Sequence, residues 1–405
     1  MQVISRPFLL KLFTSVSLLA LSTASAQHDR AGHTGGLDGL YLNANLGLIA
    51  YAYDSELLEN GFSVGKIKAT KTFGGRFSAG YHLNEDYDVQ LSVMRPGAWT
   101  SYKDISPPDQ DGTVWTNIWA ITGRRHIDLA ESTGIVLEAG VGNVSRHGIN
   151  IDGQEVIKDA HYLHPLFGFG LRQKISDKWH LSLNATYSPP KKSINQPATT
   201  LVTAGTEFSL TRLSDEKIKK NKKTPYYFPK HIIQVAYSGD WAGFDINRQF
   251  STGLSTSIPV FWLGDVLVNS GFVASYQHNI FHTYKNFSLD WGGSIATFRT
   301  QQGDSFYAVS IFPVIRWWFI RTRAMDAYFN YSLIGPAYIS SSVLDGIDTG
   351  EEATLQDFMG IGFLLFNEKK VNLDFKIMHY SNGNIFTKNP GIAIPLTIGL
   401  GYAFN

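Results

Sequence analysis

The chain of 405 residues carries 35 lysines and arginines against 34 aspartates and glutamates, so its formal charge of +1 excludes a general electrostatic attraction to nucleic acid. Charged residues make up 17% of the chain, below the roughly 25% of soluble domains, whereas aromatic residues reach 13% and glycine contributes 38 residues. The lack of cysteine excludes disulfide scaffolds, thiolate zinc sites and cysteine nucleophiles.

The first 26 residues have the order of a secretory signal peptide. Arg6 and Lys11 flank an apolar stretch, which ends in small residues at 24–26. We expect residues 1–26 to be removed by cleavage after Ala26 and the protein to be exported. Beyond this stretch no apolar run approaches the about 18 residues that a membrane helix needs. These features leave a periplasmic β-sandwich or an outer-membrane β-barrel as the two main fold classes.

Alternation of apolar and polar side chains favours the barrel. In residues 179–188 the odd positions are Trp, Leu, Leu, Ala and Tyr, and the even positions are His, Ser, Asn, Thr and Ser. The same period of two recurs in residues 134–144 and 163–172. A membrane barrel turns its apolar face to lipid, carries aromatic residues near both interfaces and fills its lumen with small or polar residues. The pattern therefore predicts transmembrane strands in the bacterial outer membrane.

The candidate strands form two sets of eight, separated by a lysine-rich run. We expect an all-β chain with two tandem eight-stranded antiparallel barrels at residues 36–213 and 228–405, joined by a charged periplasmic linker at 214–227. The alternative is one sixteen-stranded barrel, which would enclose a water channel. The expected strands lie near residues 40–52, 68–82, 86–95, 112–125, 134–146, 161–173, 178–188 and 198–212, and then near 232–241, 267–283, 286–300, 305–320, 325–340, 355–366, 372–382 and 394–404.

Two features favour tandem barrels over a single large one. The lysine-rich run is expected in a loop exposed to water. The two sets of strands also end in similar sequences, at residues 203–208 and 398–404. An aromatic residue close to the end of the last strand resembles the signal read by the outer-membrane assembly machinery, which is therefore an expected partner. With an even number of strands in each barrel, the N-terminus, the linker and the C-terminus all lie in the periplasm.

The strand predicted at 372–382 carries polar residues on both faces. Alternation sends Asn372, Asp374 and Lys376 to the lumen and places His379 and Ser381 on the lipid side. A serine hydroxyl is a weak nucleophile until an adjacent base takes its proton, so this pair has the elements needed for acyl transfer. A site facing hydrocarbon suits a substrate that stays in the membrane.

The stretch 379–391 contains His-x-Ser-Asn followed by Asn-Pro-Gly. It resembles the signature of the PagL-type lipid A 3-O-deacylases, which are eight-stranded outer-membrane barrels that hydrolyse the ester-linked acyl chain at position 3 of lipid A. The resemblance implies a carboxylic ester hydrolase with Ser381 as nucleophile, His379 as general base and Asn382 as a donor to the oxyanion. It also implies lipid A, or lipopolysaccharide, as substrate, with neither a metal nor a cofactor. Weaker landmarks of the same family lie at 313–316, 333–338 and 360–363.

One position departs from the family pattern. Some members place a glutamate twelve residues after the serine to orient the histidine, and here that position is Ala393. No acidic residue follows Asp374 in the sequence, and strand alternation places Asp374 itself in the lumen, on the face opposite His379. The orienting role could fall to a backbone carbonyl, to an asparagine such as Asn389, or to a residue of the first barrel. A non-catalytic structural or binding barrel and a small-solute pore stay open as alternatives.

The N-terminal half shows no comparable constellation. His161 and His164 are three residues apart, a spacing that puts them on opposite faces of a strand and disfavours a metal pair. The aromatic residues of 94–99 and 114–120 are typical of a membrane-interface belt. This half resembles the OmpA transmembrane domain, and it could gather substrate, contact a partner or stabilise the second barrel.

Overall fold

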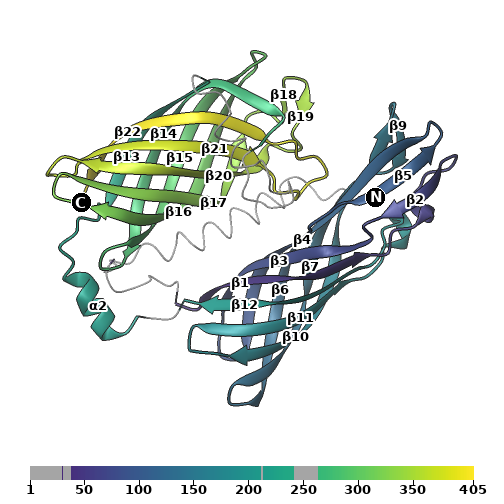
Figure 1. The fold of residues 1–405 in the computed structure, drawn as a ribbon, viewed down its shortest axis with the longest axis horizontal. Helices are drawn as coiled ribbons and strands as arrows, with labels where there is room; N and C mark the ends of the chain where they lie inside the picture. Colours follow the sequence, from purple (N-terminus) through teal and green to yellow (C-terminus); the bar gives the residue numbers. More distant parts are fainter. Residues whose placement is uncertain (1–29, 31–37, 211–212, 241–262) are drawn as a thin grey trace. The chain divides into compact units, whose positions relative to one another are not determined.

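The computed structural model describes residues 30, 38–210, 213–240 and 263–405. Their contacts group them into two compact units, of which one contains strands β1 to β12 and the other strands β13 to β22 (Figure 1). The predicted signal peptide lies outside the described residues. Within the described part, no helix has both the length and the apolar character needed to cross a membrane.

The first unit is a closed barrel of eight antiparallel strands. Each strand pairs with the next one in the ring, and pairing of β1 with β12 and of β6 with β7 closes the circle. Short hairpins and turns that the sequence analysis did not predict extend one end of it. The barrel strands are β1 (Leu40–Tyr51), β3 (Lys71–His82), β4 (Tyr87–Pro96), β6 (Gln110–Ala130), β7 (Thr133–His147), β10 (Ala160–Lys174), β11 (Trp179–Ser188) and β12 (Thr199–Ser209). The extra elements are β2 (Ser63–Lys68), β5 (Thr100–Ser106), β8 (Ile149–Ile151), β9 (Gln154–Ile157) and the 3₁₀ turns η2 (Ser55–Leu57) and η3 (Lys192–Ile194).

The second unit is a separate closed barrel of eight strands, so the tandem arrangement is confirmed and the single sixteen-stranded barrel is wrong. A small hairpin, β18 (Val343–Leu344) with β19 (Ile347–Asp348), stands in the connection between β17 and β20. The barrel strands are β13 (His231–Gly239), β14 (Val266–His282), β15 (Phe287–Thr300), β16 (Ser305–Arg321), β17 (Met325–Ile339), β20 (Ala353–Leu365), β21 (Val371–Ser381) and β22 (Ile392–Phe404).

A short helix, α2 (Asp215–Lys222), forms where the sequence analysis expected a solvated linker. The side chain of Ser214 caps it by accepting the backbone N–H of Lys217 at 3.4 Å. Acidic residues occupy its first turn and lysines its last turn, which is the charge order that the helix dipole favours. The capped N-terminus and this order of charges both favour a helix in the charged segment.

The walls of both barrels are apolar on the outside, and most of their polar side chains point inward, together with buried aromatic side chains. In the second barrel Val235 and Ile295 are each 62% exposed, whereas Gln234 and Asp290 of the same strands are buried. A closed barrel with an outward apolar surface is the form of strands that cross the bacterial outer membrane. The protein is therefore an outer-membrane β-barrel protein.

Side chains fill the lumen of the second barrel. One buried cluster includes Phe228, Trp318 and Tyr328, and a larger one includes Phe312 and Phe358. An eight-stranded barrel is just wide enough for side chains to fill it. The short turns of outer-membrane barrels lie on the periplasmic side. This rule places the three short turns after β14, β16 and β20 in the periplasm and the end of β21 at the extracellular side.

Candidate active site

Strand β21 keeps the two faces that its sequence predicts. Asn372, Asp374 and Lys376 are buried in the lumen, where the ammonium of Lys376 donates to the side chain of Gln234 at 2.8 Å. The ladder between β20 and β21 runs without a register shift along the whole of β21. Alternation therefore continues to its end and places His379 and Ser381 on the outer face.

A carboxylate from the neighbouring strand binds His379. Asp357 of β20 lies directly opposite His379 in the ladder, and its Oδ1 is 3.0 Å from the histidine Nδ1. Both residues are largely covered, at 9% and 5% exposure. Because a carboxylate oxygen accepts hydrogen bonds, Nδ1 is the ring nitrogen that donates to Asp357, and Nε2 is the nitrogen that faces away from this bond. The acid that the sequence analysis sought beyond Asp374 thus stands 22 residues before the histidine.

The other edge of the imidazole meets the turn that follows β21. Nε2 of His379 is buried and has no hydrogen-bond partner among the described residues, the hydroxyl of Ser381 included. A Cβ atom at Gly391 would lie 2.8 Å from Nε2, and the φ angle of Gly391 is +78°. Only glycine adopts this conformation without strain while leaving room for the ring. The glycine of the Asn-Pro-Gly sequence therefore leaves space next to Nε2, the nitrogen that would take a proton from a nucleophile.

Ser381 ends strand β21, two residues after the histidine and on the same outer face. It pairs with Leu355 of β20 and is partly exposed. In unliganded enzymes the hydrogen bond between nucleophile and base is often long and tightens only with substrate. The serine and the histidine thus share the outer face of β21, and Asp357 lies beside the histidine on β20.

Asn382 connects two extracellular loops. Its side-chain nitrogen donates to the carbonyl oxygens of Lys388 at 2.6 Å and Thr349 at 3.3 Å. Its backbone N–H donates to the side chain of Asn389 at 2.8 Å, whereas the partner of His379 Nδ1 is Asp357 and not Asn389. Both amide hydrogens of Asn382 are engaged, and its role as oxyanion donor stays a prediction.

An ion pair joins the same two loops. The ammonium of Lys388 lies 2.7 Å from the carboxylate of Asp348 in the β18–β19 hairpin. Burial would raise the pKa of Asp348, but hydrogen bonds from Lys388 and from the Gly350 N–H lower it overall. The two loops beside Ser381 are therefore held together by a charged pair as well as by Asn382.

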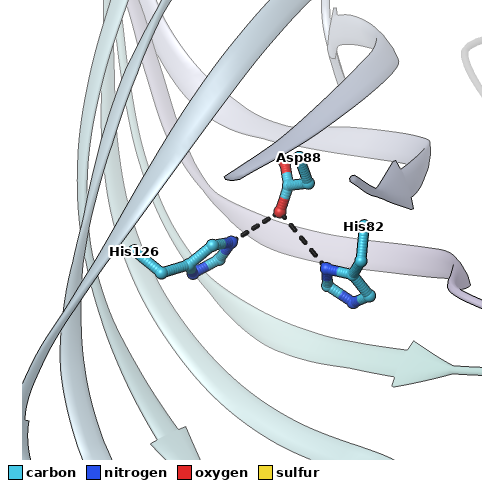
Figure 2. Close-up of side chains that lie close together, drawn as sticks. All are labelled: His82, Asp88 and His126. Carbon is cyan, nitrogen blue, oxygen red and sulfur yellow. Dashed lines mark hydrogen bonds and ion pairs between the residues drawn. The ribbon is translucent and has the colours of Figure 1, made fainter. Parts of the chain in front are cut away.

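The lumen of the first barrel brings together His82, Asp88 and His126, whose ligand atoms lie within 4.8 Å of one another (Figure 2). Arg124, however, donates to both carboxylate oxygens of Asp88 at 2.9 and 2.8 Å, and Tyr41 donates to one of them at 2.9 Å. A divalent cation at Asp88 would lie beside the guanidinium and be repelled by it. The trio is accordingly part of an internal salt-bridge network rather than a metal centre.

Comparison with known families links the second barrel to one enzyme family. The family described as lipid A 3-O-deacylase (PagL) matches residues 270–403, a segment that contains Asp357, His379 and Ser381. The comparison with curated proteins found no match.

Comparison with solved structures found outer-membrane proteins. The outer membrane enzyme PagL is 17% identical, over 43% of this chain and 98% of that chain, with a TM-score of 0.30. Neisserial surface protein A (NspA) is 16% identical over 43% and 98%, with a TM-score of 0.27. The N-terminal barrel domain of Pseudomonas aeruginosa OprF is 14% identical over 43% and 98%, also with a TM-score of 0.27.

Proposed function

We propose that the second barrel is a serine esterase that removes an ester-linked acyl chain from lipid A. The observation that carries the proposal is the outward-facing pair of Asp357 and His379, with Ser381 two residues further along the same face. A buried acid and base on a lipid-facing wall have no evident structural purpose, because charges there cost free energy. The match of residues 270–403 to the lipid A 3-O-deacylase family supports the same chemistry.

The chemistry follows from the order of the three side chains. The Ser381 oxygen attacks the ester carbonyl while its proton passes to Nε2 of His379, and Asp357 stabilises the imidazolium through Nδ1. Collapse of the tetrahedral intermediate breaks the bond to the sugar oxygen, which takes the proton from His379. Water, deprotonated by the same Nε2, then attacks the acyl-serine ester and releases the fatty acid and the free hydroxyl of Ser381.

The surroundings fit an acyl chain. Below His379 the outward side chains of β21 are Ile377, Phe375 and Leu373, and Ile361 of β20 is exposed beside them. A fatty acyl chain would lie along this apolar wall in the hydrocarbon, with its ester at the polar end of β21. Lipid A occupies the outer leaflet, which borders the extracellular end of the barrel.

The oxyanion donor is the least defined part of the site. The family resemblance assigns it to Asn382, whose amide hydrogens bind the carbonyls of Thr349 and Lys388 in this structure. Donation to an oxyanion would require one of those bonds to open when substrate binds. Without such opening, Asn382 serves the reaction by fixing the loops beside Ser381.

Mass spectrometry of lipid A from cells that express the chain tests the proposal. The wild-type protein should remove one acyl chain, and Ser381→Ala should abolish the loss. Ser305→Ala, which changes an exposed serine at the extracellular end of β16, is the matched control and should leave the loss intact. Unchanged lipid A in cells with a folded wild-type barrel, judged by its heat-dependent gel mobility, would show that the barrel is structural and not catalytic.

A further inference from the structure

The periplasmic end of the second barrel is surrounded by exposed basic side chains. Each of its three short turns carries at least one, namely Lys285, Arg323 and Lys370, and Lys230 precedes β13. Helix α2 and the residue after it add five lysines. We call this set the basic collar: Lys217, Lys219, Lys220, Lys222, Lys223, Lys230, Lys285, Arg323 and Lys370, all exposed.

Helix α2 is held next to the turn where β14 and β15 leave the membrane. The hydroxyl of Thr224, just after the helix, donates to the backbone carbonyl of Tyr284 at 2.5 Å. The ammonium of Lys220 lies 5.5 Å from the centre of the Tyr284 ring, and that of Lys285 lies 5.5 Å from the ring of Tyr226. These contacts keep the lysines of the helix beside the membrane surface rather than out in the periplasm.

Acidic residues do not balance the collar. The exposed acidic residues of the same turns and helix are Asp215, Glu216 and Glu368, and Glu368 pairs with Lys370 at 2.7 Å. The buried Asp326 is already engaged by Arg321 and Lys369. The periplasmic end of this barrel therefore presents a net positive surface.

The first barrel shows that this charge is no requirement of the fold. Its short turns on the periplasmic side carry four exposed acidic residues, namely Glu85, Asp86, Glu131 and Asp177, and only two lysines lie there, Lys174 and Lys178, of which Lys174 pairs with Asp177 at 3.0 Å. Both barrels have eight strands and similar walls, so the basic collar belongs to the second barrel alone among the described residues.

We propose that the basic collar binds the phosphate groups of anionic glycerophospholipids in the periplasmic leaflet of the membrane. Ammonium and guanidinium groups next to a bilayer attract anionic headgroups, and basic clusters beside membrane-spanning segments bind such lipids. The tyrosines that anchor α2 sit at the same level, where aromatic rings prefer the headgroup region. The collar thereby anchors the periplasmic end of the barrel to one class of lipid while the site at the other end stays accessible from the outer leaflet.

Native mass spectrometry of the full chain in a neutral detergent tests the proposal, with phosphatidylglycerol and phosphatidylcholine as probes. The test variant is Lys219→Gln/Lys222→Gln/Lys223→Gln, because glutamine keeps the helix propensity of lysine and Lys220, which packs on Tyr284, is left in place. Lys66→Gln/Lys68→Gln on strand β2 is the matched control, since these lysines are also exposed but lie in the extracellular hairpin of the first barrel.

The wild type and the control should retain phosphatidylglycerol in preference to phosphatidylcholine. The triple variant should lose at least about tenfold in phosphatidylglycerol affinity, given a roughly fivefold effect for each basic side chain near an anionic surface. Equal retention by the triple variant and the wild type, or equal binding of the two lipids by the wild type, would overturn the proposal.

Discussion

Replacing Asp357 by asparagine should slow ester hydrolysis by about 1,000- to 10,000-fold without unfolding the barrel. The carboxylate stabilises the imidazolium that forms when His379 takes the proton of Ser381, and it selects the tautomer that leaves Nε2 basic. Asparagine has nearly the same shape, so the packing around position 357 is kept. Its amide group, however, supplies no negative charge, and its NH₂ favours the wrong tautomer of the histidine.

The size of the effect follows from the geometry. The two interacting atoms are 3.0 Å apart, between side chains that are largely buried. At this separation and with an effective dielectric constant of about 20, two unit charges attract each other by about 5 kcal/mol. Since about 1.4 kcal/mol changes a rate tenfold, loss of this attraction in the transition state corresponds to three to four orders of magnitude.

The assay follows fatty acid released from lipopolysaccharide by the purified protein in detergent, measured by mass spectrometry over time. Asp374→Asn is the matched control. Asp374 also lies on β21, but it points into the lumen, where its carboxylate accepts a hydrogen bond from the side-chain amide of Asn330. It should retain most of the activity if the barrel stays folded. A rate for Asp357→Asn within threefold of the wild type would refute the proposed role of Asp357, and an equally slow Asp374→Asn would show a general effect of lost charge.

Three further predictions concern the surroundings of His379. Gly391→Ala should reduce kcat at least about 100-fold, because the new Cβ would lie 2.8 Å from Nε2 in a strained backbone; activity at the wild-type level would show that the ring has room to move. Ala393→Glu should restore at least tenfold activity to Asp357→Ala, since position 393 lies opposite His379 on β22 and offers a carboxylate from the other side; an inactive double variant that folds would mean that the histidine accepts an acid from β20 alone. Asn382→Ala should lower the free energy of unfolding by about 1–3 kcal/mol, because two carbonyls lose their donor; a lower kcat with unchanged stability would support the oxyanion role instead.

Strand alternation predicts most of the fold because the membrane imposes it on every strand that crosses. Each of the sixteen expected strands is present in the structure, and the face assigned to Asp374 is the observed one. The pattern misses β2 and β5, which lie outside the alternating segments. Strand β5 pairs with the 21-residue strand β6, and β2 pairs with β5. It also misses α2, although Ser214 followed by acidic residues and then lysines is a helix-start signal.

The site was predictable in part. The faces of His379 and Ser381 follow from local alternation, whereas the partner of the histidine depends on the register between β20 and β21, which no local pattern determines. A signal for it was nevertheless present. Asp357 shares the outward, apolar face of β20 with Met359 and Ile361. A carboxylate on this face is as unexpected as the histidine on β21.

The position of the site on the outer wall changes how substrate would reach it. A pocket in a soluble enzyme meets its substrate by diffusion in three dimensions, whereas the outer face of the wall that carries His379 and Ser381 borders the membrane, so a lipid substrate would reach it by moving within the plane of the membrane. For the proposed esterase, the effective concentration is then the mole fraction of lipid A in the leaflet, and dilution with an inert lipid or detergent slows the reaction even when the bulk concentration is unchanged. Because side chains fill the lumen, substrate would not pass through it. The proposed reaction therefore depends on the extracellular end and the outer surface of the barrel.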